Sequence, residues 1–109
     1  VCAEAEDRYL EMFGAPSAEA DGVEVVLMYK YNFCPAALTV PSGTTVRWVN
    51  VDKRTSHSVL VKGSGQPESD RAFPEEIIEF TFLEPGAHDY LCGPHWETQN
   101  MIGMVTVED

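Results

Sequence analysis

The strongest constraint on the fold is a series of short segments with β-strand character, separated by turn-forming residues. Between Val23 and Phe33 every odd position is apolar or aromatic and polar residues interrupt the other face, a period of two that is typical of a half-buried strand. Further strand-like segments are residues 37–40, 45–51, 56–61, 77–82, 87–92 and 102–107. Turn-formers such as Pro41-Ser42-Gly43 and Glu84-Pro85-Gly86 separate them. This pattern predicts an all-β fold, a Greek-key β-sandwich.

The first part of the chain has a different character. Residues 4–13 are good helix formers with early acidic groups, and Gly14 and Pro16 end the segment. Residues 14–22 have the composition of a linker. We therefore expect a short N-terminal helix and linker over residues 1–22, followed by a β-domain over residues 23–109. The chain begins without Met and without a basic and apolar leader, as expected of a mature or trimmed product.

The charge balance disfavours several classes of partner. With 7 Lys and Arg against 18 Asp and Glu, the net charge is -11, which repels nucleic acids and anionic membranes. Apolar runs are far shorter than the roughly 20 residues that cross a bilayer. The acidic excess is either a solvated face or a field that steers a basic, cytochrome-like partner.

Three cysteines leave at least one thiol outside any disulfide. One interpretation pairs Cys2 with Cys34, which would attach the helix to the sandwich, and another makes Cys2 a lipid-bearing N-terminal residue. Neither Cys-x-x-Cys nor His-x-x-x-His is present, which disfavours structural zinc. A Cys/His protease normally needs a larger scaffold with a cleft.

The third cysteine lies in the most informative segment. Cys92-Gly93-Pro94-His95 follows a predicted strand, Met101 lies six residues after His95, and His57 is on an earlier strand. Gly93 permits and Pro94 stiffens a tight turn that folds His95 back beside Cys92. Two imidazoles, a thiolate and a distant thioether are the ligands of a blue-copper site, in which Met binds weakly along the axis.

We predict His57, Cys92 and His95 as metal ligands and Met101 as the axial ligand. Met104 and Gln99 are alternatives for the axial position, and His88 lies some 13 Å down the strand from Cys92.

Several motifs resemble one known family. Tyr90–His95 and Met101–Val107 are similar to the copper loop of plastocyanins and pseudoazurins, and Val40–Asn50 and Ser56–Val59 extend the similarity. On these motifs, residues 23–108 resemble the cupredoxin family of type 1 blue copper proteins. The loop departs from the family in having five residues between His95 and Met101, one more than usual, and Ser58 stands where the family often has Asn.

The resemblance implies a function. One copper ion would alternate between Cu(II) and Cu(I), so the protein would be a one-electron carrier and not an enzyme, with the edge of His95 as the electron port. It would be a monomer in the periplasm or another extracytoplasmic space, serving redox proteins such as a c-type cytochrome or a copper enzyme. Trp96, beside His95, is either core or part of an apolar docking patch.

Two alternatives stay open. If the longer loop holds Met101 away, the open axial position would suit a copper redox enzyme or a nitric oxide binding site. The third possibility is copper storage or delivery.

Overall fold

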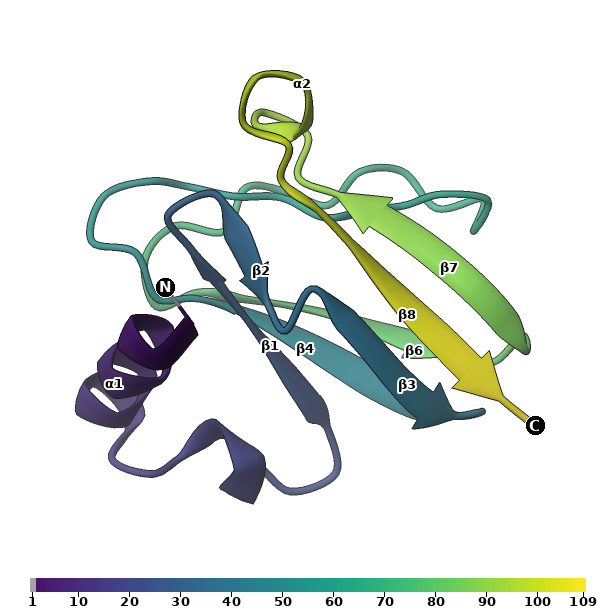
Figure 1. Ribbon diagram of the computed structural model, residues 1–109, viewed down its shortest axis with the longest axis horizontal. Helices are drawn as coiled ribbons and strands as arrows, with labels where there is room; N and C mark the ends of the chain where they lie inside the picture. Colours follow the sequence, from purple (N-terminus) through teal and green to yellow (C-terminus); the bar gives the residue numbers. More distant parts are fainter. Residues whose placement is uncertain (1) are drawn as a thin grey trace.

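Two four-stranded β-sheets pack face to face in the computed structural model, which describes residues 2–109 (Figure 1). Along the chain the elements are α1 (Cys2–Phe13), η1 (Ser17–Glu19), β1 (Glu24–Tyr29), β2 (Asn32–Cys34), β3 (Ala37–Pro41), β4 (Thr44–Asn50), β5 (Leu60–Val61), β6 (Ile77–Phe82), β7 (Gly86–Leu91), α2 (Trp96–Gln99) and β8 (Ile102–Glu108). The strand orders are β2-β1-β4-β6 and β3-β8-β7-β5. Pairs β1–β4 and β3–β8 are parallel, and the other pairs are antiparallel. The predicted all-β sandwich with a short N-terminal helix is confirmed.

The single strand predicted over residues 23–33 is wrong, because this segment is a hairpin. β1 ends at Tyr29, and the chain reverses through Lys30 and Tyr31, whose φ angles are 48° and 63°. Two successive positive φ angles give the tight turn that matches strand twist, although Lys and Tyr are not its usual residues. Asn32 supports the turn by donating its side-chain N–H to the Lys30 carbonyl at 2.8 Å. Apolar and polar residues continue to alternate through the turn, so the sequence pattern did not indicate it.

The strand β1 is buried on both faces, which corrects the expectation of a half-buried strand. Val26 and Met28 belong to the core between the sheets, whereas Leu27 and Tyr29 pack in a second cluster with helix α1. In Figure 1 the helix lies beside β1, on the outside of the sandwich. The apolar odd positions Leu27 and Tyr29 thus face α1, whereas Val26 and Met28 at even positions face the core between the sheets.

A disulfide joins the helix to the sheet. Cys2 at the start of α1 is bonded to Cys34 at the end of β2, with Cα atoms 5.5 Å apart. The pairing of Cys2 with Cys34 is thus confirmed in the structure. Cys92 is the free cysteine, and it is buried.

The main core holds the two sheets in a fixed relation. Trp48 on β4 and Tyr90 on β7 are among its largest fully buried side chains, and their ring centroids lie 5.1 Å apart. Phe33 also contacts Tyr90, with ring centroids 4.7 Å apart. Because Tyr90 lies two residues before Cys92, this packing fixes the end of β7 at which the predicted metal site begins.

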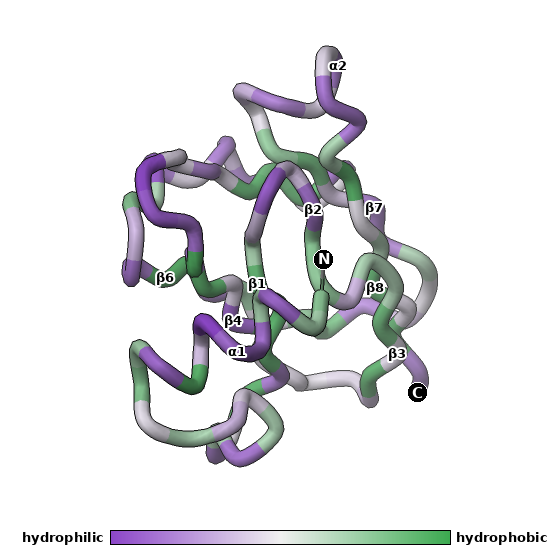
Figure 2. The backbone as a smooth tube through the Cα atoms, turned by 60° about the vertical axis from the view of Figure 1, so that its left-hand side comes forward, coloured by the Kyte–Doolittle hydropathy of each residue, from purple (hydrophilic) through white to green (hydrophobic). Residues whose placement is uncertain are grey.

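The segment 56–61 is less regular than predicted. Only Leu60 and Val61 form a strand, and His57 makes an isolated bridge with Ala72. Leu60 and Val61 pair with β7, whereas His57 pairs with a loop residue, which leaves one end of the sandwich built from irregular chain. Figure 2 shows that the loop carrying α2, at this same end, is mostly hydrophilic.

None of the helices between residues 2 and 109 combines the length and the apolar character needed to cross a membrane.

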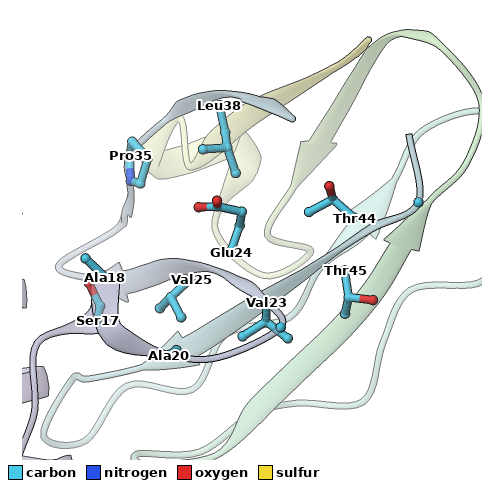
Figure 3. Close-up of a pocket in the computed structure, with 12 residues that line it drawn as sticks. Ser17, Ala18, Ala20, Val23, Glu24, Val25, Pro35, Leu38, Thr44 and Thr45 are labelled. Carbon is cyan, nitrogen blue, oxygen red and sulfur yellow. The ribbon is translucent and has the colours of Figure 1, made fainter. Parts of the chain in front are cut away.

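A surface hollow of about 630 Å³ lies at the other end of the sandwich (Figure 3). Its lining includes Glu24 at the start of β1 and Thr44 at the start of β4. The parallel register pairs Met28 with Asn50 at the opposite ends of these strands. The hollow is thus remote from the predicted metal ligands.

Candidate metal centre

Three predicted ligands meet at the irregular end of the sandwich. One donor atom each from His57, Cys92 and His95 lies within 4.8 Å of the others. Cys92 Sγ is 3.7 Å from His57 Nδ1 and 3.4 Å from His95 Nδ1. The two imidazole rings stand at 69° with centroids 5.2 Å apart. Residues far apart in the chain therefore direct two nitrogens and a sulfur at one point.

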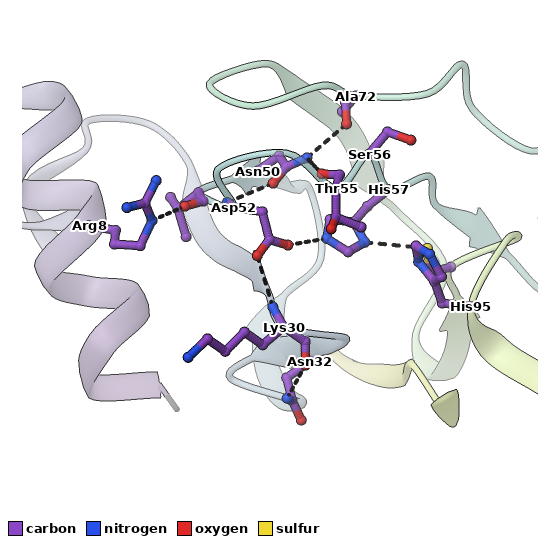
Figure 4. A network of polar contacts seen from close by, with 12 residues as sticks. Arg8, Lys30, Asn32, Asn50, Asp52, Thr55, Ser56, His57, Ala72 and His95 are labelled. Atoms are coloured by element: carbon purple, nitrogen blue, oxygen red, sulfur yellow. Dashed lines mark hydrogen bonds and ion pairs between the residues drawn. The ribbon is translucent and has the colours of Figure 1, made fainter. Parts of the chain in front are cut away.

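His57 is held by backbone and side-chain contacts. Its N–H donates to the Ala72 carbonyl at 3.0 Å, and the Ala72 N–H donates back at 2.7 Å. Its side-chain Nε2 lies 2.5 Å from Asp52 Oδ2, and Figure 4 shows His57 between Asp52 and His95. The Asp52 carboxylate is fixed in turn, because its Oδ1 accepts the Lys30 N–H at 3.2 Å. Both edges of the imidazole thus have a defined neighbour.

Asn50 shapes the loop between Asp52 and His57. This fully buried amide donates to the Thr55 and Ala72 carbonyls at 2.8 and 2.9 Å, and its Oδ1 accepts the Asp52 N–H at 2.9 Å. A buried side chain with these bonds satisfied fixes a loop that has no regular ladder.

Cys92 lies at the buried side of the cluster. Its side chain is fully buried, and the Ser58 N–H donates to Sγ at 3.5 Å. Burial raises the pKa of the Cys92 thiol, and the backbone N–H groups of Ser58 and His95 partly oppose this rise. A metal that replaces the thiol proton would relieve this cost, since a thiolate is the ligand form.

The loop from Cys92 to Met101 contains one helical turn that was not predicted. The Cys92 carbonyl accepts the His95 and Trp96 N–H groups at 3.1 and 2.9 Å, and α2 follows. Asn100 ends the turn in the left-handed conformation, with φ 55° and ψ 39°. Met101 then returns beside Cys92, whose N–H donates to the Met101 carbonyl at 3.1 Å. The five intervening residues are accommodated by this turn, and Met101 is fully buried.

Gly93 has a different role from the expected tight turn. It is not among the glycines with positive φ, so left-handed backbone does not require it. A Cβ atom at Gly93 would lie 2.2 Å from Glu68 Oε2. A side chain at Gly93 would therefore displace the Glu68 carboxylate from its present position.

His95 lies at the outer side of the cluster and is partly exposed. Tyr31, in the β1–β2 turn, contacts its ring edge-on with centroids 4.8 Å apart. Partial burial lowers the pKa of His95, and the neighbouring His57 and Arg71 act in the same direction. The imidazole is thus favoured in the neutral, metal-binding form.

Other candidate residues lie outside the cluster. His88 Nε2 is 2.7 Å from the Glu84 carbonyl, and Met104 is exposed on β8. Trp96 is 42% exposed, which excludes the core alternative and leaves its ring at the surface next to His95.

Asp52, Glu68 and Tyr31 are neighbours of the site that the sequence pattern did not predict. Asp52 carried the best signal, because a carboxylate five residues before a predicted ligand histidine is within reach across a loop. Glu68 and Tyr31 are close only through the tertiary fold.

The chemistry of the donor set fits copper. Two imidazole nitrogens and one thiolate, with a buried thioether residue next to them, suit a trigonal copper site with a weak axial ligand. Residues 23–108 match the model of the copper binding proteins of the plastocyanin/azurin family.

The chain belongs to the plastocyanin/azurin family. The cupredoxin resemblance is therefore confirmed, and this family consists of single-copper electron carriers, so copper is the cofactor. The family match covers the two sheets and the cluster, and α1 lies outside it.

Curated relatives and solved structures agree with this assignment. The chain is 36% identical to a halocyanin from Natronomonas pharaonis over 72% of this chain and 49% of that protein. It is 34% identical to an amicyanin from Paracoccus denitrificans over 86% of this chain and 72% of that protein. The structure of a reduced, Cu(I) amicyanin variant superposes with a TM-score of 0.71 at 33% identity, over 84% of this chain and 89% of that one. The chain thus spans about half the length of the halocyanin and most of the amicyanin.

Proposed function

We propose that this protein is a one-electron carrier whose copper is held by His57 Nδ1, Cys92 Sγ and His95 Nδ1, with the Met101 sulfur as weak axial ligand. The observation that carries the proposal is the convergence of these three donor atoms within 4.8 Å. Met101 is assigned because it is buried and hydrogen-bonded through its carbonyl to Cys92.

The residues of the chain preorganise the site. Bound copper would supply the couple between Cu(II) and Cu(I). Asp52 orients His57, the Ser58 N–H stabilises the sulfur anion, and the core around Tyr90 fixes the strand that precedes Cys92. A site with fixed ligands needs little rearrangement when its charge changes, which favours fast electron transfer.

The partner would dock at the exposed side of the site. His95 is partly exposed there; its ring contacts exposed Tyr31, and exposed Trp96 follows it in the chain. Two exposed aromatic side chains beside His95 suit a redox protein, such as a c-type cytochrome or a copper enzyme, that brings its own centre close to His95. No bound substrate is required for this activity, so we propose a monomeric carrier and not an enzyme.

The disulfide between Cys2 and Cys34 supports a periplasmic or other extracytoplasmic location, because such bonds persist in oxidising compartments. We further propose that residues 23–109 are the copper-binding domain and that residues 1–22 form an added helix and linker. The family match over residues 23–108 supports this division.

Adding Cu(II) to the apo-protein and recording the visible spectrum tests the proposal. We expect an intense thiolate-to-copper band that is absent from Cys92→Ser and altered in His57→Ala. His88→Ala, which changes a histidine outside the cluster, is the matched control and should keep the band. Persistence of the colour in Cys92→Ser would reject this ligand set.

Azide titration distinguishes the carrier from an open copper site. We expect the spectrum to be unchanged, because buried Met101 lies next to Cys92. An azide-dependent spectrum would instead indicate an accessible coordination position.

A further inference from the structure

Ser58 is a buried polar residue that connects the two segments bearing the inner ligands. It follows His57 in the chain and is fully buried. Its N–H donates to Cys92 Sγ at 3.5 Å, and its Oγ accepts the Gly93 N–H at 3.0 Å. Ser58 therefore contacts the segment of Cys92 at two points.

The hydroxyl proton of Ser58 has its own acceptor. Ser58 Oγ donates to Glu68 Oε2 at 2.7 Å. A hydroxyl has one proton, so the bond to Glu68 directs the oxygen lone pairs toward the Gly93 N–H. A hydrogen bond to a carboxylate is also stronger than one to a neutral acceptor. Glu68 thus determines how Ser58 is oriented.

Glu68 is held in place by its own loop. The next residue, Ser69, donates its N–H to the Val59 carbonyl at 3.0 Å and accepts the Val59 N–H on its Oγ at 2.9 Å. With the bridge between His57 and Ala72, these bonds align residues 69–72 with residues 57–59. The backbone therefore presents Glu68 to Ser58.

Gly93 provides the space for this contact. A Cβ atom there would lie 2.2–2.4 Å from the Glu68 carboxylate. The carboxylate therefore lies directly against the backbone between Cys92 and Pro94. The segments that carry Ser58, Glu68 and Gly93 thus meet at the Glu68 carboxylate and the Ser58 hydroxyl.

We propose that Glu68 is a positioning residue of the copper site, which acts through Ser58 to hold the segments of His57 and Cys92 together and to keep the Ser58 N–H on the sulfur. This inference rests on the proposed copper function and adds to it a residue that does not bind the metal. Its effect is on ligand geometry and copper retention.

The test compares Glu68→Ala with Asp70→Ala, which removes a neighbouring carboxylate whose side chain makes no hydrogen bond in the described part of the chain. We expect Glu68→Ala to release copper to a chelator roughly tenfold faster or more, the scale typical of partners of metal ligands. Its charge-transfer band should shift, because the hydrogen bond to sulfur is weakened. Asp70→Ala should match the wild type in both measurements.

Two further variants separate position from charge. Glu68→Gln keeps an acceptor for the Ser58 hydroxyl and should restore most of the copper retention. Gly93→Ala displaces the carboxylate without removing its charge and should release copper as quickly as Glu68→Ala. The double variant with Gly93→Ala and Glu68→Ala should release copper no faster than either single variant, because both changes break the same contact.

The apo-protein gives an independent readout. Cys92 is the one thiol outside the disulfide, so the rate of its alkylation reports how firmly its segment is held. We expect faster alkylation in Glu68→Ala and no change in Asp70→Ala. The inference would be overturned if Glu68→Ala matched the wild type in its rate of copper release, its band position and its rate of alkylation. A wild-type protein without the blue band would instead reject the proposed function.

Discussion

Asp52 Oδ2 lies 2.5 Å from Nε2 of His57, on the edge of the ring opposite the Nδ1 atom that faces Cys92 (Figure 4). An ionised carboxylate can only accept, so Nε2 carries the proton and the Nδ1 lone pair is free for a metal. The pair therefore selects the tautomer as well as the orientation of the imidazole.

Removing the Asp52 carboxylate should weaken copper binding without removing a ligand. For Asp52→Ala we expect roughly tenfold to hundredfold lower affinity, measured by competition with a copper chelator. Asp52→Asn is the control, because its side-chain oxygen still accepts a hydrogen bond from Nε2. Equal affinities for Asp52→Ala and the wild type would show that the carboxylate does not position His57.

Met101→Leu should change the reduction potential more than it changes copper binding. Loss of a weak sulfur donor destabilises Cu(II) relative to Cu(I), so the potential should rise while the blue band persists. Voltammetry measures the shift, and Met104→Leu, at an exposed methionine, should leave the potential unchanged. Collapse of copper binding in Met101→Leu would contradict the weak axial role.

Replacing both Cys2 and Cys34 by Ser should destabilise the fold. The two residues are 32 apart in the sequence, and closing a loop of this length lowers the unfolded-state entropy by an amount worth about 3–4 kcal/mol. Denaturant unfolding should show this loss of free energy of unfolding, while the copper band should stay unchanged. A changed band would indicate that α1 also supports the site.

Stability should decrease in alkaline solution because of Tyr90. Burial raises the pKa of Tyr90 to about 12, with a smaller opposing contribution from Trp48. In the unfolded chain the phenol ionises near pH 10, so above that pH only the folded chain keeps the proton. The stability due to neutral Tyr90 is thus complete below about pH 10 and is lost as pH rises toward 12, by about 1 kcal/mol at pH 11.

Unfolding of the wild type and of Tyr90→Phe at pH 8, 10 and 11 measures this contribution. The Phe variant should lose less stability over this range, because it has no phenol to ionise. Identical pH dependence in the two proteins would exclude Tyr90 as the source.

The amino-acid sequence was sufficient to predict the sandwich and the short N-terminal helix. Periodicity and turn residues are local signals, so they identified most strands from β3 to β8 directly. They failed between Val23 and Phe33, where the Lys30-Tyr31 turn lacks the usual turn residues. The burial of β1 on both faces depended on where α1 packs, which no local pattern contains.

The same division applies to the metal site. The types and order of His57, Cys92, His95 and Met101 were enough to predict a copper site, because few metals suit that set of donors. Only the tertiary structure placed Asp52 on the far edge of His57 and Glu68 against Gly93. These contacts depend on the conformation of irregular loops, which no repeat or spacing in the sequence indicates. The sequence alone determined which atoms could bind the metal, and the packing of the chain decided how they are held.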